Sequence, residues 1–422
     1  MLAAAPIATD PMNQQALNDR LDRLADQCVK CGLCIPHCPT YRLRLDEAES
    51  PRGRIALIQG LAQGRLADSP RLRDHLASCL ECRACEVACP SLVQVGALMV
   101  GARALTHRNN GPWRRWRAKA WLDVLASPEG TRVASRLAAF YRRTGLARLA
   151  ERTGLARWPG LGAYHRVARQ LGTPARPASL RAAAEATGDE VELFLGCVAR
   201  SAQPGALAAA QRVLERLGYR VRVAPGQGCC GAMHRHNGLP EAADRLLGRT
   251  ASAASGRLMI GIASACVAEL KSDPDIDARE ICRFLADLAW PSDLRLRPLE
   301  RRIAVHEPCS HRNQLRDATA AYDLLRRLPG AEPVALPDNA FCCGAAGTYL
   351  LQQPATSRAL LAPKLEALAE LGAEILVTTN TGCALHLAAG VREAGLAVEV
   401  LHPLELIARQ LGDEVEHPVR PA

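Results

Sequence analysis

Two stretches of the sequence, CVKCGLCIPHCP (28–39) and CLECRACEVACP (79–90), repeat one cysteine pattern. Each stretch reads Cys-x2-Cys-x2-Cys-x3-Cys-Pro, a spacing typical of [4Fe–4S] ligation. Three closely spaced thiolates can hold one face of an iron–sulfur cube, and soft thiolates favour such clusters over magnesium or calcium. Proline then ends the loop, because it lacks an N–H group and has a fixed φ. The two stretches therefore predict two [4Fe–4S] clusters.

The spacing also predicts how the two runs share their ligands. In two-cluster proteins with this pattern, the fourth cysteine of each run ligates the other cluster. The first expected ligand set is Cys28, Cys31, Cys34 and Cys89, and the second is Cys79, Cys82, Cys85 and Cys38. Zinc is the alternative metal. A zinc site takes four ligands from two short cysteine pairs, which does not account for two identical runs of four cysteines. The long segment between the runs contains a predicted helix at 52–63, and another is predicted at 14–26, so we expect a helical two-cluster ferredoxin.

Eight further cysteines form two sets that repeat with a period near 113 residues. The first set is Cys197, Cys229, Cys230 and Cys266, and the second is Cys309, Cys342, Cys343 and Cys383. Such a period indicates an internal duplication. Cys282 stands outside both sets, in the helical run AREICRFLADLAW (278–290), and we interpret it as a core residue.

Short β-rich runs alternate with helical runs in both halves of this duplication. Strands are predicted at 191–196, 219–224 and 257–263, and again at 302–306, 332–336, 374–379 and 398–401. This alternation indicates parallel sheets, in which the carboxyl ends of the strands share one edge. Because the cysteines follow strands, four thiols should converge in each repeat. They would form a further iron–sulfur site, a dithiol redox site or ordinary buried thiols.

Several motifs together resemble one family. They are the paired cysteine runs, SPRGRI (50–55), GCCGAMHRHNG (228–238), FCCGAAGTY (341–349) and TTNTGCALHLAAG (378–390). The sequence resembles the iron–sulfur subunits of glycolate oxidase, within the larger family of CCG-domain proteins that includes heterodisulfide reductase subunits. The resemblance implies an electron-transfer subunit, with no catalytic residue of its own, in a complex whose partner subunits carry FAD. Those partners would oxidise a 2-hydroxy acid, here glycolate to glyoxylate, and the electrons would leave for a quinone-type acceptor.

The sequence departs from heterodisulfide reductase at one cysteine position in each repeat, and this bears on its alternative functions. CCG domains of heterodisulfide reductase end in Cys-x2-Cys, whereas this sequence has Cys266-x2-Glu269 and Cys383-x2-His386. One thiolate is therefore missing from each repeat, which argues against a catalytic thiol–disulfide reductase. His386 is either a substitute ligand or an ordinary hydrogen-bonding histidine. A relay for lactate or glycerol-3-phosphate oxidation is the remaining alternative.

The positive charge of the sequence is concentrated in one segment without cysteine. The 422-residue chain has a formal charge of +10, and residues 103–169 alone carry 15 basic and three acidic residues. The stretch RNNGPWRRWRAKAW (108–121) mixes arginine with tryptophan. Such a segment favours an anionic lipid surface or an acidic partner subunit, or it is simply a solvated helix. Nucleic acid is disfavoured, because an iron–sulfur module offers no element that reads bases.

Some motifs are absent from the sequence. It contains no G-x-G-x-x-G after a strand and no G-x-x-x-x-G-K, so flavin is expected on another chain. Its longest apolar run, 258–267, is too short to span a bilayer, and residues 1–12 do not resemble a secretory signal. We therefore expect a cytoplasmic protein, with a peripheral position on the inner face of the cell membrane as a further option.

These patterns divide the sequence into four parts with an α plus α/β fold class. A two-cluster ferredoxin-type region is expected at 14–100, a basic helical connector at 101–188, a first cysteine-rich repeat at 189–295 and a second at 300–412. Each repeat is expected to be an α/β domain with a parallel sheet.

Overall fold

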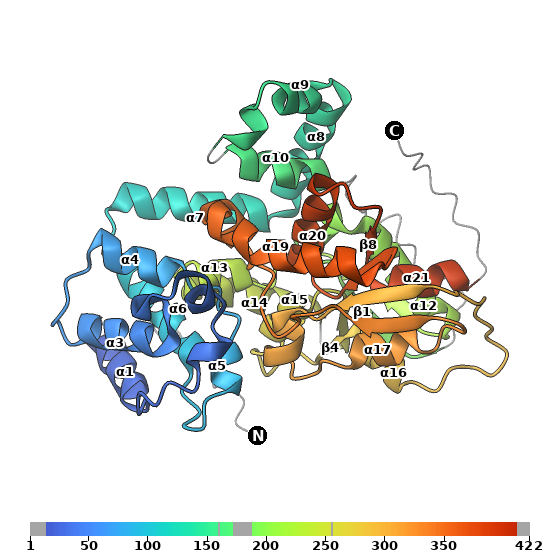
Figure 1. Cartoon of the computed structure of the whole chain (residues 1–422). Helices are drawn as coiled ribbons and strands as arrows, with labels where there is room; N and C mark the ends of the chain where they lie inside the picture. Colours follow the sequence, from blue (N-terminus) through green and yellow to red (C-terminus); the bar gives the residue numbers. More distant parts are fainter. Residues whose placement is uncertain (1–13, 159–160, 172–187, 255, 412–422) are drawn as a thin grey trace.

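The computed structural model describes residues 14–158, 161–171, 188–254 and 256–411. The chain forms a helical amino-terminal region, a helical connector and two α/β repeats, which confirms the predicted fold class (Figure 1). Three predicted features lie outside the described residues. They are the opening segment 1–12, the end of the connector at 172–187 and the end of the second repeat at 412.

The ferredoxin-type region is a set of short helices around an apolar core. They are α1 (Gln14–Asp26), α2 (Pro39–Arg44), α3 (Pro51–Ala62), α4 (Pro70–Ala77), α5 (Ala84–Val87) and α6 (Val95–Arg108). Helix α3 begins where Ser50 accepts a hydrogen bond from the Gly53 N–H, with Pro51 in the first turn. Ile58 of α3 and Leu98 and Met99 of α6 are fully buried in the core.

The described residues of the connector are mainly helical, and the connector continues from α6, which runs across residue 100. Its helices are α7 (Pro112–Ala126), α8 (Pro128–Arg143), α9 (Leu146–Arg152) and α10 (Leu161–Gln170). In Figure 1 this segment passes over the top of the molecule. Helix α10 returns to the second repeat, where Arg166 forms an ion pair of 2.7 Å with Glu393.

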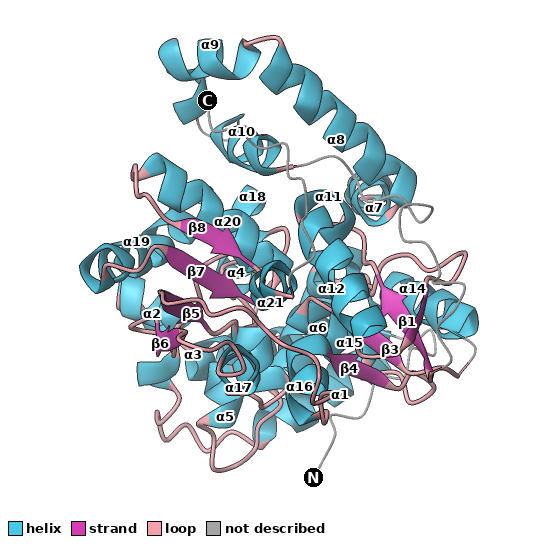
Figure 2. Ribbon diagram, turned by 90° about the vertical axis from the view of Figure 1, so that its right-hand side faces the viewer, coloured by secondary structure: helices cyan, strands magenta, loops and turns pink. Residues whose placement is uncertain are grey.

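The two repeats contain one four-stranded parallel sheet each (Figure 2). The first repeat consists of β1 (Glu190–Phe194), α11 (Ala199–Ala202), α12 (Pro204–Arg216), β2 (Arg220–Arg222), α13 (Ala232–His236), α14 (Pro240–Ala254), β3 (Met259–Gly261), α15 (Ser264–Leu270), β4 (Ala278–Glu280) and α16 (Ile281–Asp287). The second consists of β5 (Arg302–His306), α17 (Ala320–Leu325), β6 (Glu332–Ala335), α18 (Tyr349–Gln352), α19 (Pro354–Leu371), β7 (Ile375–Thr378), α20 (Thr381–Glu393), β8 (Glu399–Leu401) and α21 (Pro403–Gln410).

The strand orders of the two sheets are equivalent, β2-β1-β3-β4 and β6-β5-β7-β8. In each sheet the first strand of the repeat lies in the centre, and every neighbouring pair is parallel. Seven of the eight strands lie at predicted positions, while β4 was not predicted. The repeated strand order supports the duplication inferred from the cysteine spacing.

The two repeats share one hydrophobic core. Helix α12 of the first repeat packs on α21 of the second, and α16 packs on α17. Leu207 and Leu214 of α12 and Leu404 and Ile407 of α21 are fully buried in the same cluster. In the part of the chain that the structure describes, no helix is both long and apolar enough to cross a membrane.

Candidate metal and redox sites

The cysteines of the first predicted ligand set surround one cavity. Cys28, Cys31, Cys34 and Cys89 all line it. The first three come from the loop between α1 and α2, while Cys89 follows α5. Cys28 and Cys89 thus line the same cavity, although they are 61 positions apart in the sequence.

The second predicted set surrounds a neighbouring cavity. Cys38, Cys79, Cys82 and Cys85 line this space, together with Met99 of α6. Cys85 also lines the first cavity, so the two cavities adjoin. The fourth cysteine of each run therefore lies with the first three of the other run.

The backbone of both cysteine loops has the same unusual conformation. Lys30 and Gly32 in the first loop have φ of 57° and 86°, and Glu81 and Arg83 at the matching positions have φ of 50° and 57°. Positive φ at non-glycine residues is strained, and such turns direct backbone N–H groups toward an anionic group. This geometry and the four thiols at each cavity fit a [4Fe–4S] cluster.

Burial of the thiols agrees with ligation. It raises the pKa of Cys82 and Cys85 well above the ordinary value for a thiol. Such thiols stay protonated in an apolar site, but a bound metal ion deprotonates the thiols that coordinate it. The donor set therefore suits a cationic metal centre better than free thiolate chemistry.

The SPRGRI stretch at the start of α3 contacts the loops of both cavities. Arg52 donates a hydrogen bond of 3.2 Å to the carbonyl oxygen of Lys30. Arg54 is 2% exposed, forms an ion pair of 2.6 Å with Glu49 and places a guanidinium nitrogen 3.9 Å from the Cys38 sulfur. Arg54 also donates a hydrogen bond of 2.7 Å to the hydroxyl of Ser78, the residue before Cys79, so the start of α3 contacts both cysteine runs.

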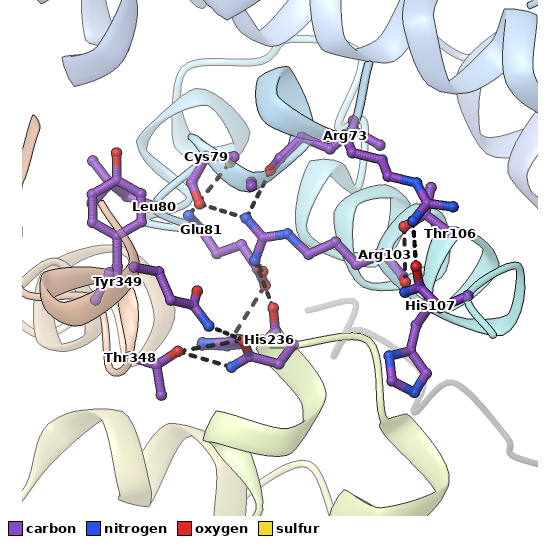
Figure 3. A pocket seen from close by; sticks show the side chains of 16 residues that line it. Arg73, Cys79, Leu80, Glu81, Arg103, Thr106, His107, His236, Thr348 and Tyr349 are labelled. Carbon is purple, nitrogen blue, oxygen red and sulfur yellow. Dashed lines mark hydrogen bonds and ion pairs between the residues drawn. The ribbon is translucent and has the colours of Figure 1, made fainter. Parts of the chain in front are cut away.

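Arg103 on α6 connects the second cavity to the first repeat (Figure 3). Its guanidinium donates to the Cys79 carbonyl oxygen at 2.6 Å and to the His236 carbonyl oxygen at 2.7 Å, and it pairs with Glu81. These residues surround a pocket of about 200 Å³ where the ferredoxin-type region meets both repeats. The junction fixes the backbone beside Cys79 and Cys82 relative to the repeats.

The four cysteines of the first repeat come together at the edge of its sheet. The sulfur atoms of Cys197 and Cys229 are 3.4 Å apart. Cys230 lies within hydrogen-bonding reach of both Cys229 and Cys266. The thiols that follow β1, β2 and β3 are far apart in the sequence, but in the structure they form one continuous group.

The second repeat has the same arrangement. The sulfur atoms of Cys309 and Cys342 are 3.9 Å apart, and Cys343 interacts with Cys342 and Cys383. The glycines after each cysteine pair, Gly231 and Gly344, both have φ of 92°. A Cβ atom there would lie 2.7 Å from the Ala243 carbonyl oxygen or 2.6 Å from that of Ser357, so only glycine fits.

One further ligand candidate in the second repeat was missed by sequence reasoning. A ring nitrogen of His306 and the sulfurs of Cys343 and Cys383 all lie within 4.8 Å of one another. Burial lowers the pKa of His306 well below its ordinary value, so the ring is neutral and able to bind a metal. Its place at the end of the predicted strand 302–306, three residues before Cys309, is the signal that could have found it.

The residues at the positions of the missing fifth thiolates have other contacts. His386 is buried and lies 3.1 Å from the carbonyl oxygen of Ser357, to which its ring N–H donates. Glu269 forms a buried ion pair of 2.5 Å with Arg235. His306, rather than His386, is therefore the histidine that the structure groups with cysteines of the second repeat.

The two repeats differ in what covers their cysteines. Cys342 and Tyr349 of the second repeat belong to the same buried cluster as Leu80 and Cys82, with Cys309 packed against it. Cys197 and Cys229 of the first repeat instead pack against Ala126 of the connector. The second site therefore adjoins the ferredoxin-type region, whereas the first adjoins α7.

Two known protein families match parts of the chain. A family described as a 4Fe-4S dicluster domain matches residues 24–93, and one described as a cysteine-rich domain matches residues 191–271 and 303–388. The fold and its cysteine sites define an iron–sulfur electron-transfer protein.

Individual relatives identify the family more closely. The chain is similar to the glycolate oxidase iron-sulfur subunit of Escherichia coli (strain K12), at 32% identity over 96% of this chain and 99% of the relative. It is also similar to the probable glycolate oxidase iron-sulfur subunit of Bacillus subtilis (strain 168), at 28% identity over 96% and 99%. Lactate utilization protein A of Oceanobacillus iheyensis is 28% identical over 52% of this chain and 96% of its own length. The chain belongs to the family of glycolate oxidase iron–sulfur subunits.

Proposed function

We propose that this chain carries electrons from FAD on partner subunits, which oxidise glycolate to glyoxylate, through two [4Fe–4S] clusters to a quinone-type acceptor. The observation that carries the proposal is the pair of adjoining cavities, lined by the two crossed sets of four cysteines with Cys85 common to both. A [4Fe–4S] cluster in each cavity would supply one-electron exchange. The chain's own residues hold these sites close together, with Cys38 and Cys82 of the second site buried and Cys31 of the first exposed.

The experiment uses the chain co-purified with its flavin subunits under anaerobic conditions. Glycolate should reduce the iron–sulfur EPR signals of the complex, while the isolated chain should not respond to glycolate. Lactate and glycerol 3-phosphate serve as competing substrates. Faster cluster reduction by either of them, or reduction of the isolated chain by glycolate, would contradict the proposal.

We also propose a further iron–sulfur site in the second repeat. Its protein ligands would be Cys309, Cys342, Cys343, Cys383 and His306. His306 would take the place of the missing fifth thiolate, and the packing of Cys309 beside Cys82 would allow exchange with the ferredoxin-type region. The four cysteines of the first repeat would form a second redox group.

Iron analysis tests this further site. Two clusters account for about eight iron atoms per chain, so a clear excess over eight is expected in anaerobically purified protein. Cys343→Ser should remove the excess, whereas Cys282→Ser, at a buried cysteine outside both sets, should keep it. Eight irons in the wild-type chain, or an excess that Cys343→Ser does not change, would exclude the site.

The basic connector is proposed to place the complex against the inner face of the cell membrane. Trp113 and Trp116 are 64% and 59% exposed, with their rings stacked at 5.0 Å. Arg114, Arg115 and Arg117 are exposed beside them. Exposed indole rings with basic side chains suit an anionic lipid surface, where a quinone would be available.

A further inference from the structure

A large cavity lies between the connector and the first repeat. Its volume is about 790 Å³, and its walls come from the junction of α7 and α8, the loop 223–229 and helix α14. Cys229 forms part of its lining. The space beside the loop is open, because a Cβ atom at Gly226 or Gly228 would meet nothing within 4 Å.

The lining of this cavity is strongly basic. The five basic residues are Lys119, Arg132, Arg200, Arg245 and Arg249, and the two acidic residues are Asp123 and Glu129. Lys119 and Asp123 form an ion pair with each other. Within the described ranges, the salt bridges of the protein include none that involves Arg132, Arg245 or Arg249. The positive charge of these three arginines is therefore directed at the cavity or at solvent.

Arg200 is the most unusual member of this lining. Its residue is only 7% exposed, and its guanidinium donates to two carbonyl oxygens, those of Gly196 at 3.1 Å and Gln227 at 3.4 Å. No carboxylate of the described residues forms a salt bridge with it. Burial lowers the pKa of Arg200, which reflects the cost of a charge removed from water. Glu129 of the same lining acts on Arg200 through its charge but forms no salt bridge with it. A buried guanidinium without an ion-pair partner favours binding of an anion.

The second repeat provides an internal comparison. Cys309 corresponds to Cys197, so Arg312 corresponds to Arg200 and Glu307 corresponds to Leu195. Arg312 forms an ion pair of 3.1 Å with Glu307. In the first repeat the leucine at this position cannot supply a negative charge. Of these two corresponding arginines, the one without a salt bridge to a described carboxylate is thus in the repeat that has the cavity.

We propose that this cavity binds a small anion with at least two negative charges, beside the cysteines of the first repeat. The planar guanidinium group matches both carboxylate and phosphate in two-point hydrogen bonding, which explains a lining of several arginines. A dicarboxylate and inorganic phosphate share this chemistry. The proposal does not depend on glycolate as substrate or on a quinone as acceptor.

Calorimetric titration of the full chain, with its clusters in place, tests the proposal. Malonate and inorganic phosphate are the two probes, each at ionic strength held constant with potassium chloride. We expect at least one probe to bind with a stoichiometry of one. The double variant Arg132→Gln/Arg245→Gln should weaken binding at least tenfold. Both side chains are exposed, so the fold should tolerate the change.

A matched control removes the same charge elsewhere. Arg114→Gln/Arg117→Gln alters two exposed arginines of α7 that do not line the cavity, and binding should stay within twofold of wild type. Binding of malonate alone would assign the site to carboxylates, and binding of phosphate alone would assign it to phosphate groups. Equal weakening in both double variants, or no binding of either probe, would overturn the proposal.

Discussion

The last cysteine of each run, Cys38 or Cys89, tests how the ligands are shared. Cys89 lines the same cavity as Cys28, and Cys38 lines the same cavity as Cys79. We therefore expect Cys89→Ser to alter the same EPR signal as Cys28→Ser. Cys38→Ser should alter the signal that Cys79→Ser alters, and Cys282→Ser should leave both signals unchanged. If Cys89→Ser resembles Cys79→Ser instead, each run keeps its own fourth ligand.

Glu280 provides a prediction about pH. This residue is 4% exposed, and burial raises the pKa of its carboxyl group from 4.5 to about 8. Because the folded protein holds this proton more tightly than the unfolded chain does, its contribution to stability is complete below pH 4.5 and is lost as the pH rises through 8. The melting temperature of wild type should therefore fall more steeply than that of Glu280→Gln over this range.

The Glu280→Gln variant keeps the oxygen that caps α16. The Glu280 side chain accepts a hydrogen bond from the Arg283 N–H, and a glutamine side chain can do the same. A difference of about 5 °C at pH 9 relative to pH 5 is expected from a destabilisation of a few kcal/mol. Glu366→Gln, at an exposed position of α19, is the control and should parallel wild type. Parallel melting curves for all three proteins would show that Glu280 does not titrate in this range.

Among single residues, those with a fixed sequence spacing were the predictable ones. The run spacing groups Cys38 with Cys79 and Cys89 with Cys28, and in the structure each of these pairs lines one cavity. His306 and Arg200 were not found in this way, because their roles depend on what the fold brings near them. A histidine at the end of a strand or an arginine after a cysteine carries no distinctive local pattern.

At the scale of elements, the start of α3 is sensitive to a single methyl group. A Cβ atom at Gly53 would lie 1.9 Å from the Glu47 carbonyl oxygen. Gly53→Ala should therefore shift the turn that carries Arg52 and Arg54, destabilise the protein by at least about 2 kcal/mol and reduce its iron content. Thermal melting and iron analysis measure both effects.

Gly111→Ala is the matched control for this change. Gly111 precedes α7 with φ of −61°, and a Cβ atom there would meet nothing within 4 Å. This variant should keep the stability and iron content of wild type. If Gly53→Ala behaves in the same way, α3 does not depend on close contact with the segment at Glu47.

The positions of helices and strands with a clear hydrophobic period were predicted well, whereas a short strand without such a period was not predicted. Helix α1 has the predicted bounds, and α3 begins one residue earlier than predicted, at Pro51. Strand β4 was missed because its three residues, Ala278, Arg279 and Glu280, show no run of β-favouring side chains. It is a strand because β3 offers it a partner, with Ile260 opposite Arg279. Tertiary pairing of this kind leaves no local signal.

At the scale of the whole molecule, the connector should govern membrane association. We expect Arg114→Gln/Arg117→Gln to weaken binding to vesicles containing phosphatidylglycerol about thirtyfold in co-sedimentation, because each of the two basic residues contributes about 1 kcal/mol near an anionic surface. Added salt should weaken wild-type binding in the same way. Arg279→Gln, at an exposed arginine of the first repeat, is the control. Equal binding by all three proteins would mean that the connector contacts a protein partner or solvent.

The arrangement of the parts was less predictable than the parts themselves. The cysteine period predicted two similar repeats, and both sheets have equivalent strand orders. Sequence reasoning did not predict that the second repeat packs beside Cys82 while the first packs beside the connector. It also did not predict the cavity, whose lining comes from α7, α8 and the first repeat. Packing between distant segments determines these features.

The core shared by the two repeats has a consequence for biosynthesis. Ile303 and Leu404 complete a cluster that begins with Val191, so the first repeat leaves the ribosome with apolar surface still uncovered. The eight cysteines of the ferredoxin-type region, by contrast, are all translated within the first 89 residues. We expect a nascent chain to be competent for iron–sulfur loading before its carboxyl-terminal half can fold. Premature termination after residue 300 would therefore yield an aggregation-prone product that already carries metal.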